Sequence, residues 1–239
     1  MEQFIYTSDD VLGMLDALLE GRDGTWWDEF FAHPARPIPF LVDWPDENLA
    51  EWFGSGLLTP GRVLELGCGQ GRNAVYLAGL GCSVDAVDFS AHAIGEARKR
   101  AEQAGRPVNF WCSSIFDAGF PSEAYDLVYD SGCFHHLPPH RRRSYVELVH
   151  RALKLGGSYG LVCFRPEGGS GFTDLQVYQR ASLGGGLGYA GDRLRALWEQ
   201  PPFSVRVLRP MNKTDGQGPC FGEDFLWVLL AVKAAKGHA

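Results

Sequence analysis

From residue 62 onward, short apolar runs alternate with segments of helical periodicity, and this alternation limits the possible folds more than any other feature. Each run has the length of one buried strand, and strands that alternate with helices build a parallel sheet covered by helices. The sequence therefore predicts an α/β fold. The expected strands are residues 63–66, 83–87, 108–112, 125–129 and 158–164, and the expected helices are residues 73–78, 91–104 and 141–153, the last with Gly156 and Gly157 as its C-cap.

Two further strands are expected near the end of the chain, at residues 204–208 and 225–232. No long apolar helix separates them, so we expect them to pair as an antiparallel hairpin at the edge of the sheet. A chain of 239 residues suits one large α/β domain. We assign that domain to residues 61–239, with an insertion at residues 167–200.

The first sixty residues follow a different pattern. Residues 9–20 have the spacing of an amphipathic helix, with Ser8 placed to cap it and Gly21 to end it. An aromatic group at residues 26–31 follows. The next segment contains four prolines, whose missing amide donors disfavour a regular strand or a long helix. We expect residues 1–60 to form an arm, or lid, packed on the main domain.

A glycine-rich turn, Glu-Leu-Gly-Cys-Gly-Gln-Gly at residues 65–71, directly follows the first expected strand and opens a helix. Glycines let backbone amides approach a ligand, and the N-terminus of the next helix carries a partial positive charge. Asp88 ends the second expected strand, where a carboxylate can accept hydrogen bonds from ribose hydroxyls. The turn and the carboxylate together indicate a nucleoside ligand.

A nicotinamide or flavin dinucleotide is the competing ligand. Its loop reads G-x-G-x-x-G, and the third glycine is needed for close packing of helix on strand. Counted from Gly67, that position is Arg72. A dinucleotide-dependent reductase is therefore disfavoured.

The pattern Glu65-x-Gly67-x-Gly69-x-Gly71 resembles the first motif of the class I S-adenosylmethionine-dependent methyltransferases, and Asp88 matches the acidic residue of their second motif. The resemblance implies a Rossmann-like sheet, S-adenosylmethionine as cofactor and S-adenosylhomocysteine as product. It places the turn against the methionyl group, Asp88 on the ribose and Ser114 where many relatives have an acidic residue for adenine. The expected cofactor-binding residues are Glu65, Gly67, Cys68, Gly69, Arg72, Asn73, Asp88, Phe89, Ser114, Ile115 and Asp130.

Two stretches, residues 67–73 with Tyr76-Leu77-Ala78, and Asp130-x-Gly132 with Leu137-Pro138-Pro139 and Arg143-x-Tyr145, resemble the thiopurine and tellurite-resistance methyltransferase branch of that family. This resemblance covers about residues 62–164. In that branch an aromatic N-terminal arm closes over cofactor and acceptor. The resemblance thus implies that Trp26, Trp27 and Phe31 contact the acceptor. Ordinary core packing of the arm is the alternative.

Two histidines, His135 and His136, follow the strand at residues 125–129. Ligands of an open parallel sheet gather at the carboxyl ends of its strands, and histidine titrates near neutral pH. Both are candidate bases for the acceptor's proton, with a structural role as the alternative. Asp130, at the end of the same strand, is expected to contact the methionine tail or the acceptor.

The insertion supplies a second group of acceptor candidates. Glycine clusters bracket a helical stretch there, and loops of this kind often carry binding residues. Tyr178, Arg180 and Tyr189 are expected to bind an acidic or aromatic acceptor. A solvated surface loop is the alternative.

Composition narrows the function further. The net charge is -7, and the only dense basic run is residues 141–143, which disfavours nucleic acid as a partner. The chain shows neither an apolar run long enough for a membrane span nor a signal-peptide start, so we expect a cytoplasmic protein. The six cysteines form no CxxC pair, and no metal is expected. No residue pattern indicates an oligomeric state.

These features lead to one functional hypothesis, a methyltransferase that moves a methyl group by in-line displacement from S-adenosylmethionine to a small molecule. The alternative is a regulatory protein that binds the same cofactor without transferring a methyl group.

Overall fold

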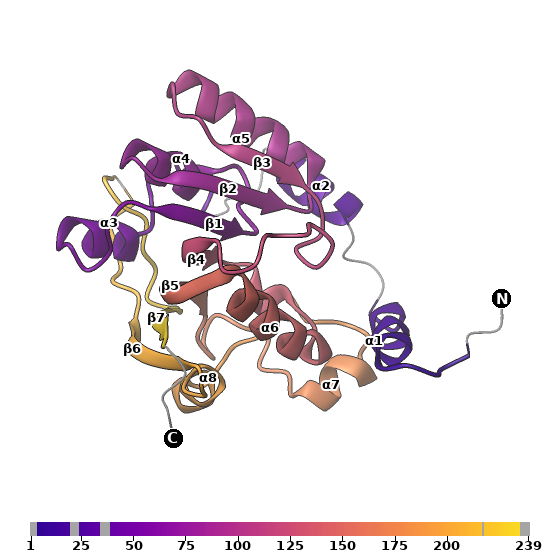
Figure 1. The fold of residues 1–239 in the computed structure, drawn as a ribbon. Coiled ribbons are helices and arrows are strands. Elements are labelled where there is room, and N and C mark those ends of the chain that lie inside the picture. The colour runs from indigo at the N-terminus through magenta and orange to yellow at the C-terminus, as the bar shows by residue number, and fades with distance from the viewer. Residues whose placement is uncertain (1–3, 20–23, 34–38, 217, 235–239) are drawn as a thin grey trace.

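The structure, a computed structural model, describes residues 4–19, 24–33, 39–216 and 218–234. A seven-stranded sheet runs through its centre (Figure 1), with the strand order β3-β2-β1-β4-β5-β7-β6. The strands are β1 (Arg62–Leu66), β2 (Ser83–Asp88), β3 (Asn109–Cys112), β4 (Tyr125–Ser131), β5 (Leu153–Phe164), β6 (Phe203–Pro210) and β7 (Leu226–Lys233).

Strands β1 to β5 are all parallel, whereas β7 is antiparallel to both of its neighbours, β5 and β6. The expected mostly parallel sheet with an antiparallel C-terminal hairpin at its edge is confirmed. Because β1 pairs with β2 on one side and with β4 on the other, the strand order reverses at the β1–β4 boundary. Open α/β sheets bind their ligands at such a reversal.

Helices cover both faces of the sheet. Apolar side chains of α3, α4 and α5 form the core on one face, and those of α6 and α8 form the core on the other. Trp52 of α3 and Trp198 of α8 are among the largest fully buried side chains of the two cores. The covering helices are α3 (Glu47–Gly54), α4 (Arg72–Gly79), α5 (Ala91–Gln103), α6 (Arg142–Ala152) and α8 (Gly191–Trp198).

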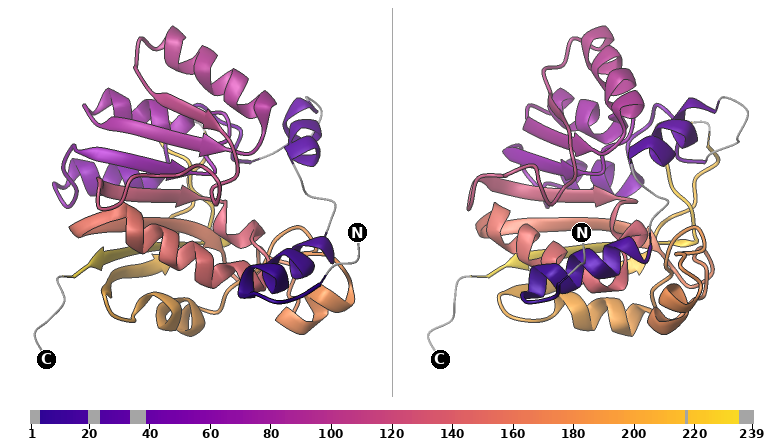
Figure 2. Two further views of the ribbon diagram at one scale, coloured as in Figure 1. Left: turned by 45° about the vertical axis from the view of Figure 1, so that its right-hand side comes forward. Right: turned by 90° about the vertical axis from the view of Figure 1, so that its right-hand side faces the viewer.

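The remaining helices gather beyond the carboxyl ends of the parallel strands (Figure 2). Two of them belong to the N-terminal arm and three to the segments after β4 and β5. They are α1 (Ser8–Ala17), α2 (Gly24–Ala32), the 3-10 turns η1 (Phe134–His136) and η2 (Pro139–Arg141), and α7 (Asp174–Gln179). No helix of the described ranges is long and apolar enough to cross a membrane.

Three details differ from the sequence-based expectations. The cap of α1 is Thr7 rather than Ser8, because the Thr7 hydroxyl accepts the Asp10 amide in a capping box. The expected end of this helix at Gly21 lies outside the described residues, as do Pro34 and Pro37. Helix α3 was not expected, and it begins two residues after Pro45, at a position where proline no longer disturbs the helix.

The expected glycine cap of α6 is wrong. The helix ends at Ala152, and Leu153 is already extended and pairs with Tyr125. The ammonium group of Lys233 donates to the carbonyls of His150 and Leu153, at 2.9 and 2.7 Å, and so satisfies the acceptors that a glycine cap would have served. Gly156 and Gly157 instead lie within β5, next to a shift in its register with β4.

Candidate functional site

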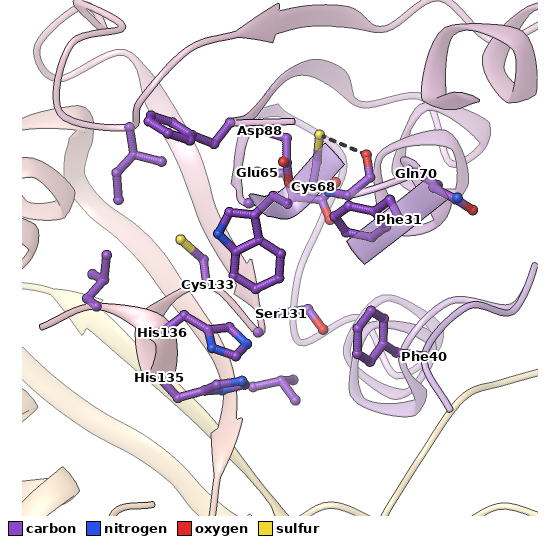
Figure 3. A pocket seen from close by; sticks show the side chains of 18 of the residues that line it. Phe31, Phe40, Glu65, Cys68, Gln70, Asp88, Ser131, Cys133, His135 and His136 are labelled. Atoms are coloured by element: carbon purple, nitrogen blue, oxygen red, sulfur yellow. Dashed lines mark hydrogen bonds between the residues drawn. The ribbon is translucent and has the colours of Figure 1, made fainter. Parts of the chain in front are cut away.

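A cavity of about 1180 Å³ opens at the carboxyl ends of the strands, where the strand order reverses. The turn after β1, the end of β2, the turn after β4 and helix α2 all contribute to its walls. Figure 3 shows Glu65 and Asp88 on one side of Cys133, and His135 and His136 on the other. After the roles expected from the sequence, we call the part next to the glycine turn the donor side and the part next to the histidines the acceptor side.

The glycine turn needs glycine for reasons visible in the structure. Gly67, Gly69 and Gly71 all have positive φ, at 66°, 52° and 76°. A Cβ on Gly67 would lie 2.5 Å from the Cβ of Cys133, so the turn and the segment after β4 touch there. A Cβ on Gly71 would lie 2.9 Å from Ala97 of α5. Gly71 thus provides the close packing that the third glycine provides in a dinucleotide loop.

Glu65 is the last-but-one residue of β1, and its side chain is 2% exposed. It lines the cavity, and its Oε2 atom has no hydrogen-bond partner within the protein. Burial, which disfavours the charged form, raises the pKa of Glu65 to about 8, with the nearby Arg72 opposing the shift. A buried carboxyl oxygen without a partner, facing a cavity, fits a ligand that carries an ammonium group.

Asp88 lies at the end of β2 and lines the same cavity, as expected. Its Oδ2 atom accepts the Gly69 amide at 2.7 Å, and its Oδ1 atom accepts the Ser90 amide at 2.9 Å. Burial raises the pKa of Asp88, although these amides work in the opposite direction. The two bonds fix the carboxylate beside the turn, and each oxygen keeps a second acceptor site for a hydroxyl.

The expected adenine-binding residues also line the cavity. Phe89 is 44% exposed, whereas Ile115 is buried. The Ser114 hydroxyl accepts the Phe116 amide at 3.2 Å and thereby shapes the turn after β3. The cavity brings all three residues together, and their role toward adenine remains a prediction.

Arg72, Asn73 and Cys68 are at the cavity wall, but their polar groups serve the protein itself. The Arg72 guanidinium pairs with Asp46 at 2.6 Å, and the Asn73 amide donates to the same carboxylate at 2.9 Å. The Cys68 thiol donates to the Gly69 carbonyl at 3.7 Å. Asp46 was missed because it stands in the proline-rich segment, where no pattern marks it.

Asp130 does not line the cavity, contrary to expectation. Its carboxylate is fully buried and accepts the amides of Cys133 and Phe134 and the hydroxyl of Tyr145, at 2.8, 3.0 and 2.5 Å. Burial raises its pKa to about 7. The side chain thus holds the turn after β4 in place, and Ser131, Gly132 and Cys133 face the cavity instead.

The two histidines line the cavity but differ in surroundings. The His135 ring is buried and stacks on Phe164, with ring centroids 3.7 Å apart, and its Nδ1 atom accepts the Phe164 amide at 3.3 Å. The His136 ring is half-buried and meets Trp27 edge to face at 4.9 Å. The structure thus places His135 as a wall and His136 as the more accessible imidazole.

Helix α2 brings Trp26, Trp27 and Phe31 to the cavity. The Phe31 ring lies close over the turn, because a Cβ on Gly69 would be 3.5 Å from it. Asp28 fastens the helix, as its Oδ1 atom accepts the Ser90 hydroxyl at 2.5 Å and the His92 amide at 2.9 Å. These three aromatics line the cavity, and their contact with an acceptor remains a prediction.

Tyr178, Arg180 and Tyr189 do not line the cavity. The Tyr178 hydroxyl bonds His140 Nδ1 at 2.8 Å, and the exposed Arg180 lies over the Phe172 ring. Tyr189 is buried against Phe134. Their partners lie in the insertion and in the segment after β4, which turns them away from the acceptor side. The insertion reaches the cavity through Ser182 and Leu183 instead.

Comparison with known proteins gives a family match. Residues 63–157 match the model of a methyltransferase domain. An uncharacterized methyltransferase of Synechocystis is 37% identical over 119 residues, 49% of this chain and 51% of that relative. One from Schizosaccharomyces pombe is 31% identical over 122 residues, 51% of this chain and 84% of that relative. The chain thus spans only about half the length of the first of these relatives.

A probable S-adenosyl-L-methionine-dependent methyltransferase, TehB of Haemophilus influenzae, is 30% identical over 108 residues, 44% of this chain and 36% of that relative. Among solved structures, a protein of echinomycin biosynthesis has a TM-score of 0.68, with 22% identity, over 90% of this chain and 94% of that one. A Burkholderia thailandensis 1,6-didemethyltoxoflavin-N1-methyltransferase was solved with 1,6-didemethyltoxoflavin and S-adenosylhomocysteine bound. It has a TM-score of 0.59 and 18% identity, and the match covers 98% of this chain and 94% of that one.

Proposed function

The chain belongs to the class I S-adenosylmethionine-dependent methyltransferases, and on this premise we propose that it methylates a small molecule bound on the acceptor side of the cavity. The observation that carries the proposal is the continuity of the cavity. A single cavity of about 1180 Å³ is lined by the carboxyl groups of Glu65 and Asp88 and by the imidazole of His136. Binding sites for drug-sized ligands have about 300–1,000 Å³, so the cavity has room for a cofactor and a second small molecule.

The residues of the donor side fit the cofactor. The unpartnered Oε2 atom of Glu65 would accept the methionyl ammonium group, Asp88 the ribose hydroxyls, and the turn at Gly67 and Gly69 would lie along the methionyl chain. When bound, S-adenosylmethionine supplies a methyl carbon attached to a sulfonium sulfur, which is a good leaving group. The acceptor's nucleophilic atom would bond to that carbon as the carbon–sulfur bond breaks, which would yield S-adenosylhomocysteine.

His136 is the candidate base on the acceptor side. Its imidazole would take the proton that an O–H or N–H acceptor loses on methylation, while Trp27 restricts the orientation of the ring. A base placed in this way contributes about 10²–10⁴-fold in rate. The His135 ring packs beside the His136 ring, with 4.3 Å between their centroids.

Calorimetry with S-adenosylhomocysteine tests the donor side first. We expect wild-type protein to bind it and Asp88→Asn to bind at least about tenfold more weakly, because two hydroxyl contacts are lost or reversed. Asp126→Asn is the matched control, since Asp126 lies at the opposite end of β4 and outside the cavity. Unchanged binding by Asp88→Asn, with an unchanged thermal unfolding curve, contradicts the proposal.

Transfer of a labelled methyl group to a panel of small molecules tests the reaction. With an acceptor from that panel, His136→Ala should lower kcat at least about a hundredfold while the affinity for S-adenosylhomocysteine stays within about twofold. Cofactor binding without transfer to any panel member would point to the non-catalytic alternative.

A further inference from the structure

The geometry points to a planar aromatic molecule without a negative charge as the acceptor, because the N-terminal arm neutralises the arginines that line the cavity. This inference rests on the proposed function and specifies its substrate class. Three arginines stand among the described lining residues, and no lysine does. An anionic acceptor could pair with one of these guanidinium groups only if that group is not already paired with a carboxylate of the protein.

Each of the three arginines is paired with a carboxylate of the arm. Arg141 donates to both oxygens of Asp16, Arg100 pairs with Asp43 at 2.8 Å, and Arg72 pairs with Asp46 at 2.6 Å. All three carboxylates come from residues 16–46, outside the sheet and its covering helices.

Asp16 shows that such a pair persists at neutral pH. Burial acts to raise its pKa, but hydrogen bonds from Arg141 and from His140, the latter at 2.8 Å, outweigh burial and hold the pKa below its usual value. The Arg141 guanidinium also lies over the Phe116 ring. An anionic acceptor would therefore have to lose its hydration without gaining an unpaired cation, which is unfavourable.

Ring faces and edges line the cavity, and so do the acidic residues Asp16 and Asp117. His135 and Phe164 form one stacked wall, and Trp27 stands edge to face with His136. Phe40 and Leu183 line the same cavity. Surfaces of this kind bind flat aromatic molecules by stacking and by burial of apolar area.

The experiment is calorimetry at pH 7 on the full chain saturated with S-adenosylhomocysteine. The probes are 2-naphthol and its anionic counterpart 6-hydroxy-2-naphthoate. We expect 2-naphthol to bind at least about tenfold more tightly than the anion. Equal or tighter binding of 6-hydroxy-2-naphthoate overturns the inference, and so does a failure of 2-naphthol to bind. If S-adenosylhomocysteine itself does not bind, the proposed function fails first, so the two failures are distinguishable.

A matched pair of variants tests the part played by the arm. Asp16→Asn removes the charge opposite Arg141, so affinity for 6-hydroxy-2-naphthoate should rise at least about threefold while that for 2-naphthol is unchanged. Asp174→Asn removes the carboxylate that pairs with Arg142 at 2.8 Å, and Arg142 does not line the cavity, so it should change neither affinity. No gain for Asp16→Asn, or the same gain for both variants, overturns the neutralising role of the arm.

Discussion

Glu65 combines deep burial with an unsatisfied oxygen, and this combination sets the electrostatics of the donor side. Burial favours the protonated form of this carboxyl even with Arg72 nearby, because ionisation would place a charge in a site that burial shields from water. A cationic ligand reverses that preference. The residue therefore couples proton binding to ligand binding.

We expect S-adenosylhomocysteine binding at pH 7 to release about one proton from Glu65, because the pKa of about 8 leaves this group mostly protonated until an ammonium group arrives. Calorimetry in buffers of different ionisation enthalpy measures the release. Glu65→Gln should abolish it and weaken binding. Buffer-independent heats for the wild-type protein would contradict this assignment.

The same pKa affects stability without ligand. A carboxyl whose pKa is raised from 4.5 to about 8 on folding stabilises the folded state most below pH 4.5, and this contribution is lost as the pH rises to 8. Asp130, with a pKa raised to about 7, acts in the same direction. Glu65→Gln should therefore show a smaller fall in thermal stability between pH 5 and 8 than the wild-type protein.

Sequence reasoning located single residues where a motif marked them. Glu65 and Asp88 were found because the turn and the strand end fix their places. Asp130 also stands at a strand end, but backbone amides of the following turn capture its carboxylate. Tyr189 was misplaced because only tertiary contacts with Phe134 decide its direction. Side-chain direction after a strand depends on the fold around it, which a residue pattern does not contain.

Helix α2 carries Trp27 and Phe31 to the cavity and is fastened to the start of α5 through Asp28. The hydrogen bond from the Ser90 hydroxyl lowers the pKa of Asp28, so the carboxylate is charged at neutral pH. Asp28 therefore links the aromatic side chains of α2 to the helix that follows β2.

Asp28→Ala should weaken S-adenosylhomocysteine binding by about three- to tenfold, because the loss of two hydrogen bonds to a carboxylate loosens α2 over the turn. We expect KM for the cofactor to rise while kcat changes less than about twofold. The neighbouring exposed Glu29 provides the control variant, Glu29→Ala, which should leave both values unchanged. Equal effects of the two substitutions would show that α2 is held by other contacts.

The strands were predictable because buried parallel strands are short, apolar and evenly separated. Helix ends were harder, as α6 shows, since Lys233 from the far end of the chain supplies its cap. Helix α3 was missed because the prolines before it obscured its short apolar pattern. Local sequence patterns therefore describe least well a helix end that is capped by a distant residue and a helix that is only two turns long.

At the scale of the whole molecule, a buried polar cluster around Asp46 connects the N-terminal arm and the segment before β7 to the sheet. Asp46 accepts from Arg72 and Asn73 of α4 and from the Tyr129 hydroxyl of β4, the last at 2.7 Å. The Asp46 backbone also forms a β-bridge with Phe221, shortly before β7. The arm, the start of α4 and the C-terminal segment therefore meet at Asp46, through its carboxylate and its backbone.

Asp46→Ala should lower the free energy of unfolding by about 3–5 kcal/mol, because it leaves the Arg72 guanidinium buried without its counter-charge. Asp43→Ala removes a carboxylate that is 83% exposed, and it should cost less than about 1 kcal/mol. Urea titration of both variants gives the comparison. A loss below about 1 kcal/mol for Asp46→Ala would contradict a structural role for the cluster.

The origin of the three carboxylates that meet the cavity arginines has an evolutionary consequence. The donor residues lie on the sheet and its turns, whereas the counter-charges come from residues 16–46, which precede it. Substitutions in the arm can therefore change which acceptors are tolerated while the donor residues stay constant. Asp46 is held in the buried cluster, so we expect such changes at Asp16 and Asp43 rather than at Asp46.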